Sequence, residues 1–327
     1  MSSPTTISVD VSLGPKKTPL LRRLQFPITL SFAPSRPPTV RDVKRAIQKT
    51  YPALYADRQK LALPAPDTNT KSIALADESA LLFDAAGKVE LVVGDLGPQI
   101  SWRTVFVVEY LGPLVIHPTI YYLPHVFYRT EVEHSALQKS IFAMVMLHFL
   151  KREIETLFLH RFSHATMPLF NIFKNSGHYH ILAGIFLAYD LYRPGFSQSA
   201  VAGTWLDNPA TLRLAVLRRE YPQFAQLSNL HNHITLRRLR PAGTSTRAVP
   251  TGYGFSWPFA LACPNYFFEL VAWSTITLMT GSLAAGLFLG VSFVQILAWA
   301  QKKHRAYKKE FGDKYSRSRK AFIPFLL

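Results

Sequence analysis

A long apolar stretch near the C-terminus constrains the fold of this chain most. From Phe267 to Ala300, 34 residues include a single charged side chain, Glu269. One helix of that length would measure about 51 Å at a rise of about 1.5 Å per residue, whereas the hydrocarbon core of a bilayer is about 30 Å thick. We therefore expect two membrane-spanning helices that are joined near Thr280–Ser282. Gly286 and Gly290 in the second helix have the spacing that permits close helix packing.

Three more segments are apolar enough to be considered as spans. They are Thr104–Tyr128, which Pro113, Pro118 and Pro124 should interrupt, a segment from Ser135 to Phe158, and His180–Tyr192. A helical span needs about 20 residues. The third segment is shorter than that and would need its flanking residues in order to cross.

The segment from Asp207 to Leu236 is ambiguous. It contains two prolines, Pro209 and Pro222, and its charged residues include Arg213, Arg218, Arg219 and Glu220. A helix over 209–220 could lie in the membrane interface, with its leucines toward lipid. A degenerate span is the alternative. The sequence thus predicts an α-helical multi-pass membrane domain with five or six spans.

The first 95 residues have the character of a soluble domain. Thr6–Leu13 and Leu24–Phe32 alternate apolar and polar residues, which predicts a β-hairpin. Thr39 can cap a following helix, and short strands are expected over 58–63, near 80–83 and over 89–93. Hairpin, helix and then short strands is the order of a ubiquitin-like β-grasp domain. We expect this domain at 1–95, as a docking module without chemistry, and the membrane domain at 96–327.

The composition of the chain excludes some classes of function and favours others. The formal charge is +17, from 37 Lys and Arg against 20 Asp and Glu, but no zinc-finger spacing, RNP-like motif or basic-region heptad is present. The basic residues cluster beside apolar runs, above all over 302–320, which favours a membrane protein that binds anionic lipid or a phosphorylated ligand.

The single cysteine, Cys263, excludes an internal disulfide framework and a Cys-based zinc site. The N-terminus lacks the apolar core of a secretory signal peptide, so insertion should depend on internal segments.

The segment Lys151–Ser176, KREIETLFLHRFSHATMPLFNIFKNS, is the main site candidate. It follows the apolar run Ile141–Leu150, and its first fourteen positions hold seven ionisable residues: Lys151, Arg152, Glu153, Glu155, His160, Arg161 and His164. Ionisable groups near bilayer depth are costly, so they usually face a polar cavity, a ligand or one another.

This segment resembles the signature of the membrane-embedded trans-2-enoyl-CoA reductases, which catalyse the last step of very-long-chain fatty-acid elongation. Four further stretches agree in family order: DLGPQISWRTVFVVEYLGPL (Asp95–Leu114), TLRRLRPAGT (Thr235–Thr244), CPNYFFE (Cys263–Glu269) and KAFIPFLL (Lys320–Leu327). The last two also resemble the wider steroid 5α-reductase superfamily. The segment Asp207–Leu236 departs from the family, whose members are more apolar there.

The resemblance implies an endoplasmic-reticulum membrane enzyme that reduces long-chain trans-2-enoyl-CoA with NADPH, alongside other fatty-acid elongation enzymes and in support of sphingolipid metabolism. It also implies that the C-terminal tail is cytosolic. One alternative is a reductase of a steroid or another conjugated lipid. A second alternative, from another class, is a non-catalytic membrane scaffold that uses the ubiquitin-like domain to bind partners. Nucleic acid is not expected as a partner.

Two residues are predicted to carry the chemistry. The resemblance places the proton-donating tyrosine at Tyr266, which otherwise could be an aromatic residue of the membrane interface. Pro264 suits an early helical turn, so Tyr266 should lie near a helix N-terminus. Lys151 should favour the tyrosinate and so assist proton transfer; alternatively it is a lysine at the end of a span that pairs with Glu155.

The remaining polar residues are assigned to binding. No Gly-x-Gly-x-x-Gly or P-loop motif occurs, so a nicotinamide cofactor needs a site unlike the Rossmann fold. The resemblance and helix spacing assign nine residues to the cofactor: Asn229, His233, Arg237, Arg240, Asn265, Glu269, His304, Arg305 and Tyr307. Five residues are assigned to the acyl-CoA substrate: Glu155, His160, Arg161, His164 and Lys174. Although His160 and His164 have the spacing of a metal pair, no carboxylate stands at the usual third position, and no metal is expected.

Overall fold

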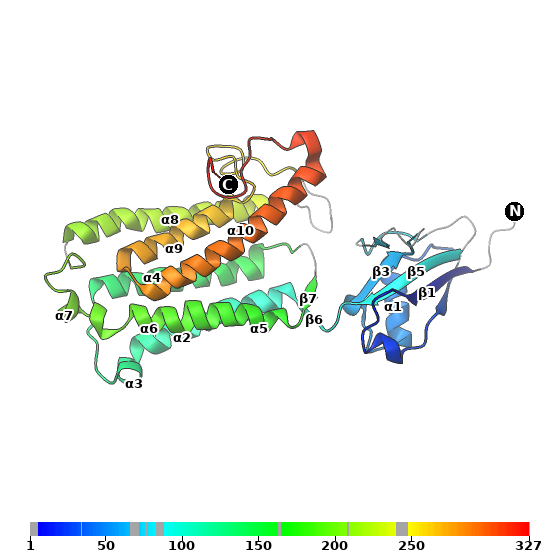
Figure 1. The fold of residues 1–327 in the computed structure, drawn as a ribbon, viewed down its shortest axis with the longest axis horizontal. Coiled ribbons are helices and arrows are strands. Elements are labelled where there is room, and N and C mark those ends of the chain that lie inside the picture. The colour runs from blue at the N-terminus through cyan, green and yellow to red at the C-terminus, as the bar shows by residue number, and fades with distance from the viewer. Residues whose placement is uncertain are drawn as a thin grey trace. The chain divides into compact units, whose positions relative to one another are not determined.

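The fold was analysed in a computed structural model of the chain. It describes residues 6–33, 35–65, 72–75, 77–82, 88–162, 165–207, 209–239 and 248–326, with the backbone alone over 209–223. The chain forms two compact units, one of residues 1–102 with 164–171, and one of residues 103–163 with 172–327 (Figure 1). Each unit has its own hydrophobic core.

The first unit is built on a five-stranded mixed sheet. Its strands are β1 (Ile7–Leu13), β2 (Ile28–Phe32), β3 (Gln59–Leu63), β4 (Ile73–Ala74) and β5 (Lys88–Asp95), in the order β2-β1-β5-β3-β4. β1 pairs antiparallel with β2 and parallel with β5, so the predicted hairpin is confirmed. Two 3₁₀ turns, η1 (Leu21–Arg23) and η2 (Ala56–Arg58), join these elements. β6 (Gln99–Ser101) and β7 (Thr166–Pro168) form a separate antiparallel pair.

Helix α1 (Val40–Thr50) covers the sheet. The Thr39 hydroxyl accepts from the backbone N–H of Asp42, and the Asp42 carboxylate accepts from the backbone N–H of Thr39, so the two residues form a capping box. Val43 and Ile47 are fully buried against the strands. These hydrogen bonds hold the pKa of Asp42 below its usual value. The helix and its cap were predicted correctly. Of the strand expected near 80–83, the structure describes residues 80–82, where Leu81 makes an isolated β-bridge to Thr39.

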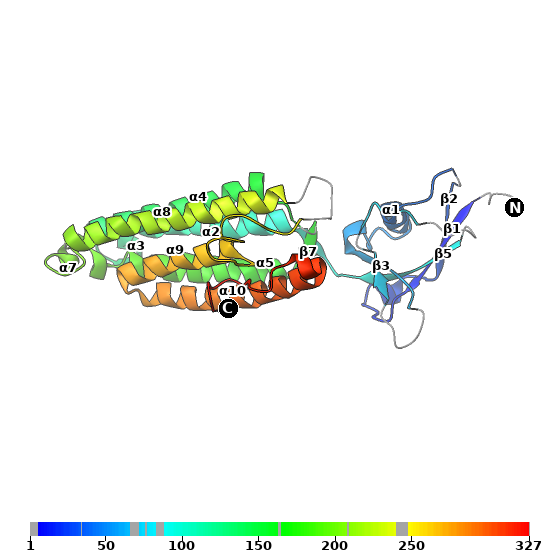
Figure 2. The ribbon, with the colours of Figure 1, turned by 90° about the horizontal axis from the view of Figure 1, so that it is seen from above.

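The second unit is an elongated helical bundle (Figure 2). Its helical elements are α2 (Trp102–Tyr122), α3 (Pro124–Tyr128), α4 (Ala136–Ile154), η3 (Glu155–Leu159), α5 (Asn171–Ser176), η4 (Gly177–Phe186), α6 (Leu187–Leu191), η5 (Pro194–Phe196), α7 (Gln198–Val201), α8 (Pro209–Arg238), α9 (Pro264–Thr280), α10 (Leu283–Phe311) and η6 (Gly312–Lys314). Elements η3 and η4 are π-helical.

Several boundaries follow the sequence. Ser135 caps α4 through a capping box with Gln138, as the start of the second span predicted. The apolar C-terminal stretch forms α9 and α10, and Gly281, in the left-handed region at φ 59°, ends α9 at the predicted turn. The left-handed conformation is one that glycine adopts without steric cost.

Other boundaries correct the sequence interpretation. Pro113 and Pro118 lie within α2 and do not interrupt it. The third helix starts at Asn171 rather than His180, because α5, η4 and α6 follow one another directly. From Asn171 to Leu191 this composite helix has 21 residues, about the length of a span. Lys174 therefore lies on a helix.

The ambiguous segment forms one continuous helix. α8 passes through position 222 and packs along α9 (Figure 2). The side chains of Asn229, Asn232 and His233 are buried. These three polar residues in the second half of α8 therefore face the interior of the bundle.

Two helical segments of the described chain are long and apolar enough to cross a membrane, Trp102–Tyr122 and Leu283–Lys314. The unit is mostly helical, and the predicted count of five or six spans stays a prediction. Among the described residues, the Gly286–Gly290 pair does not mediate close packing: a Cβ at Gly290 would meet none of their atoms within 4 Å, and one at Gly286 would make an ordinary contact with Thr277 at 3.8 Å.

Close packing occurs instead between α2 and η4. A Cβ at Gly112 would overlap the ring of His180, whose Nε2 lies 2.8 Å from the Val108 carbonyl oxygen. A Cβ at Gly184 would lie 2.7 Å from Ile116 Cδ1. These two glycines let the helix backbones approach, as small residues do at helix interfaces in membranes.

We predict that Gly112→Ala destabilises the bundle by about 1–3 kcal/mol, the usual cost of overpacking a close contact. Gly286→Ala is the matched control, since its Cβ has room and alanine favours helix over glycine by about 0.5–1 kcal/mol. Thermal unfolding of both variants in one detergent checks this. Equal melting temperatures for Gly112→Ala and the unaltered chain would contradict the α2–η4 contact.

Candidate active site

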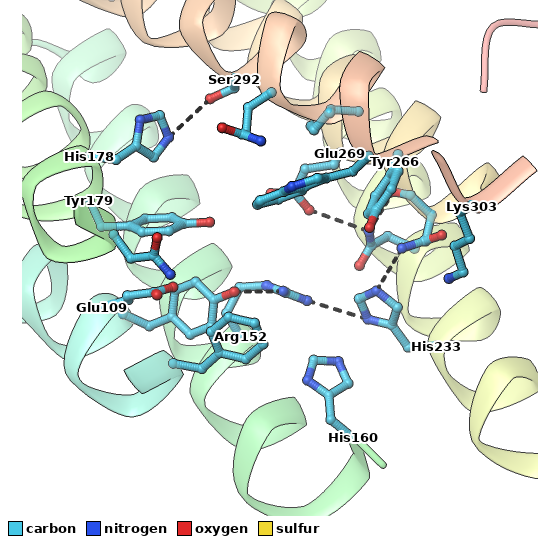
Figure 3. A pocket seen from close by; sticks show the side chains of 18 of the residues that line it. Glu109, Arg152, His160, His178, Tyr179, His233, Tyr266, Glu269, Ser292 and Lys303 are labelled. Atoms are coloured by element: carbon cyan, nitrogen blue, oxygen red, sulfur yellow. Dashed lines mark hydrogen bonds between the residues drawn. The ribbon is translucent and has the colours of Figure 1, made fainter. Parts of the chain in front are cut away.

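A cavity of about 1040 Å³ lies inside the helical bundle. Side chains from α2, α4, α5, η4, α8, α9 and α10 line it (Figure 3). One part is polar and basic, with Lys303 and Arg237 among its residues, and another is apolar, with Phe288 and Val291. A cavity of this size and mixed lining is typical of a ligand site.

A buried charge cluster lies beside the cavity. The Glu155 side chain is 2% exposed, and its carboxylate contacts three groups: Lys151 Nζ at 2.9 Å, Arg152 Nη1 at 2.8 Å and His233 Nδ1 at 3.1 Å. Glu155 begins the π-helical turn η3, and such turns are frequent at functional sites. The cluster joins the end of α4 to α8. Glu155 does not line the cavity, but its carboxylate binds Arg152 and His233, which do.

Arg152, rather than Lys151, reaches the cavity. Arg152 Nη2 donates to Tyr110 Oη at 2.7 Å, and its Nη1 lies 3.4 Å from His233 Nδ1 (Figure 3). The Lys151 ammonium instead donates to Asn229 Oδ1 at 2.6 Å. Within the described residues Lys151 does not line the cavity, and its contacts are with Glu155 and Asn229 rather than Tyr266.

Tyr266 lines the cavity from the first turn of α9. Pro264 occupies the first helical position, as its ring prefers, and Tyr266 follows two residues later. Lys303 of α10 lies at the same end of the cavity and interacts electrostatically with Tyr266 (Figure 3). The structure therefore supplies a cation near the predicted proton donor, but from a different helix than expected.

Asn265 and Glu269 share the cavity face of α9, as their spacing predicted. Glu269 is held by His148 Nε2 at 3.2 Å, Trp273 Nε1 at 3.2 Å and Asn229 Nδ2 at 3.3 Å. The Nδ2 of Asn265 lies 3.4 Å from His233 Nε2, while its Oδ1 is buried without a hydrogen-bond partner among the described residues. A buried acceptor without a partner at a cavity wall is suited to a ligand N–H donor.

The cofactor assignments divide into three groups. Six of the nine residues line the cavity: Asn229, His233, Arg237, Asn265, Glu269 and Tyr307. His304 and Arg305 do not, because His304 Nδ1 lies 2.9 Å from Tyr315 Oη and Arg305 is exposed. Arg240 lies outside the described residues.

Of the substrate assignments, His160, Arg161 and Lys174 line the cavity. His164 lies outside the described residues. Burial and the neighbouring Arg152 guanidinium lower the pKa of His160 to about 2, so its ring is neutral at pH 7. His160 can thus offer a hydrogen bond to a ligand but no charge.

Glu155, His160 and His233 bring three metal-ligating atoms within 4.8 Å of one another. However, Arg152 already occupies this cluster through its contacts with Glu155 and His233, and Lys151 adds a second positive charge. A divalent cation would be repelled by both, so the cluster is better explained as an ion-pair network.

Several cavity residues were missed in the sequence. They are Glu109 and Tyr110 on α2, and His178 and Tyr179 on η4. Tyr110 contacts Arg152 directly, and Glu109, His178 and Tyr179 are seen in Figure 3. Glu109 had a usable signal, since it is the only charged residue in the span 104–128 and such residues are commonly functional. The two η4 residues gave none, because the helix was predicted to begin after them.

Comparisons with known proteins agree with this site. Residues 165–327 match the family described as 3-oxo-5-alpha-steroid 4-dehydrogenase. A very-long-chain enoyl-CoA reductase of Dictyostelium discoideum is 37% identical over 300 residues, covering 91% of this chain and 95% of its own length. A Caenorhabditis elegans protein provisionally given the same name is 38% identical over 88% of this chain and 91% of its own. A protein of Schizosaccharomyces pombe provisionally named an enoyl reductase is 50% identical over 72% of this chain and 75% of its own.

The helical bundle and its cavity are therefore those of a membrane-embedded oxidoreductase related to the steroid dehydrogenases. Within that class, the chain belongs to the very-long-chain enoyl-CoA reductase family.

We predict that Glu155→Ala destabilises the bundle by about 3–5 kcal/mol, because two buried cations lose their shared carboxylate. Lys151→Ala should cost clearly less, since Glu155 keeps Arg152 and His233. Thermal unfolding of the two variants in the same detergent gives the comparison. A larger loss for Lys151→Ala would show that Glu155 is not the centre of the network.

Proposed function

We propose that this chain reduces the 2,3-double bond of a long-chain trans-2-enoyl-CoA to the saturated acyl-CoA, as the last step of very-long-chain fatty-acid elongation, and that it uses NADPH. The supporting observation is the position of Tyr266 in a cavity that is basic on one side and apolar on the other. The basic part suits phosphates, and the apolar part suits an acyl chain. Family membership supports the same reaction.

The residues present fit a nicotinamide cofactor. The carboxamide of such a cofactor needs an acceptor for its N–H groups, and Asn265 Oδ1 is a buried acceptor without a partner. Arg161, Arg237 and Lys303 line the same cavity and can bind its phosphates. When bound, the cofactor supplies the hydride that C3 of the enoyl group receives.

Residues of the chain itself stabilise the charges that develop during the reduction and supply the proton. As C3 is reduced, negative charge gathers on the thioester oxygen, and Tyr266 Oη donates the proton that C2 requires. A phenol has a reference pKa of about 10, so a nearby cation that stabilises the phenolate makes the transfer easier. Lys303 is placed to provide that cation.

Lys151 acts in this proposal as a positioning residue. Its ammonium holds Asn229 Oδ1, and Asn229 Nδ2 donates at 2.8 Å to the Asn265 carbonyl oxygen. This chain of hydrogen bonds fixes the first turn of α9, which carries Tyr266.

We further propose that α4, the composite helix α5–η4–α6, α8 and α9 cross the membrane with α2 and α10, giving six spans. The membrane is that of the endoplasmic reticulum, with the basic end of α10 and the C-terminal tail on the cytosolic side, as the positive-inside bias favours. The first unit would be a ubiquitin-like β-grasp module that docks other elongation enzymes. Its strand order and the helix packed on the sheet support this assignment.

The family match over 165–327 favours a second candidate, reduction of a steroid or other conjugated lipid. Purified protein offered a long enoyl-CoA and a 3-oxo-4-ene steroid, each with NADPH, separates the two. A non-catalytic scaffold would reduce neither and would leave NADPH fluorescence unchanged.

Tyr266→Phe should slow the chemical step by about 10²–10⁴-fold, the usual contribution of a general acid, while NADPH binding stays near normal. Single-turnover NADPH oxidation with an enoyl-CoA measures the step, and fluorescence titration measures binding. Tyr253→Phe is the matched control, because its hydroxyl lies 3.2 Å from Ser228 Oγ and its ring does not line the cavity. Normal turnover by Tyr266→Phe would move the search for a proton donor to Tyr307, which also lines the cavity.

Arg237→Ala should weaken NADPH by roughly 10- to 150-fold, corresponding to a charge-assisted hydrogen bond of about 1.5–3 kcal/mol, and weaken NADH far less. Arg305→Ala is the control, since Arg305 is exposed away from the cavity. Titration of both cofactors against both variants checks the difference. Equal losses on NADPH and NADH would mean that Arg237 does not hold the 2′-phosphate.

A further inference from the structure

Helix α10 forms one wall of the cavity, here called the α10 face, from Phe288 to Tyr307. Phe288, Val291, Gln295, Trp299 and Lys303 recur every three or four residues along it, and Gly290, Ser292, Val294 and Ile296 between them also line the cavity. From Phe288 to Lys303 the helix rises about 22 Å. The face is basic at Lys303, near Tyr266, and apolar at Phe288. A ligand with a charged head and a long apolar tail would lie along it.

The apolar end of this face is closed. Phe288 and Trp273 are 3% and 4% exposed, and their ring centroids are 4.7 Å apart. The His178 ring lies 5.1 Å from Phe288, and His178 Nε2 lies 3.4 Å from Ser292 Oγ (Figure 3). These contacts leave no straight path for a long chain beyond Phe288.

The side of the cavity is open. Three lining residues of α10 are well exposed, Val291 at 43%, Val294 at 67% and Trp299 at 51%, and so is Ile181 of η4 at 46%. All four residues line the same cavity and η4 and α10 pack beside each other, so we infer that the cavity opens between these two elements. Side chains that line an enclosed chamber would be buried, as Phe288 and Trp273 are. We name this gap, bordered by Ile181, Val291, Val294 and Trp299, the η4–α10 opening.

We propose that the acyl chain of the substrate leaves the bundle through the η4–α10 opening and extends into the surrounding lipid. This inference rests on the proposed function. The opening is bordered by apolar side chains on helices of the membrane domain, so a hydrocarbon tail passes from one apolar environment to another. The protein then holds only the part of the chain nearest the thioester, and a longer tail meets no wall.

Val291→Trp, which places a large ring in the opening, tests the inference. With a trans-2-enoyl-CoA of about 20 carbons the variant should lose about 10-fold or more in kcat/KM, the scale on which a pocket rejects added bulk. With trans-2-hexenoyl-CoA, whose chain ends inside the cavity, the loss should be clearly smaller than with the long substrate. Leu287→Trp is the matched control, because Leu287 is 51% exposed on the same helix and does not line the cavity. Ile181→Trp repeats the test from the opposite side of the opening.

The other possible results separate a failure of the lateral path from a failure of the proposed function. Equal losses on both chain lengths, or no loss on either, for both tryptophan variants would overturn the lateral path. If the closed end measured chain length instead, Phe288→Ala would raise the rate on the long substrate and Val291→Trp would not change it. Turnover of hexenoyl-CoA by the unaltered protein shows that the proposed function holds whatever the tryptophan variants do. An unaltered protein inactive on both substrates would overturn the proposed function itself.

Discussion

The structure of the site depends on one buried carboxylate. Glu155 neutralises Lys151 and Arg152 and contacts His233, so the charges at the end of α4 are satisfied within the bundle. Two cations buried without this carboxylate would be strongly destabilising. From the cluster, Lys151 holds Asn229 and Arg152 holds Tyr110, which ties α8 and α2 to α4. The position of Tyr266 follows, because Asn229 in turn holds the first turn of α9.

Features of the fold and the site that depend on residues only a few positions apart could be predicted from the sequence. Asn265 and Glu269, four apart on a helix that begins at Pro264, share the cavity face as expected. The Thr39 cap and the turn at Gly281 could be predicted for the same reason, since each depends on residues a few positions away. In such cases the backbone geometry of a single helix determines which side chains meet.

Which of Lys151 and Arg152 faces the cavity could not be predicted, because a rotation of one residue about α4 decides it. That rotation depends on α8, whose Asn229 and His233 lie close to 80 positions further along the chain. Likewise, the segment 209–220 of α8 was expected to lie at the membrane interface. The burial of Asn229, Asn232 and His233 later in the same helix depends on neighbours in space, which single-sequence patterns do not show.

The cavity places two unlike environments along one helix. Near Lys303 the wall carries charge and hydrogen-bonding groups, and within about 22 Å, at Phe288, it is closed by aromatic rings. Polar groups can be buried at such a site only when they are paired, which the Glu155 and Glu269 networks achieve. The apolar part needs no such pairing and can open to lipid without leaving backbone groups unsatisfied, since η4 and α10 remain helical there. The same helix therefore borders both a charged part and an apolar part of one cavity.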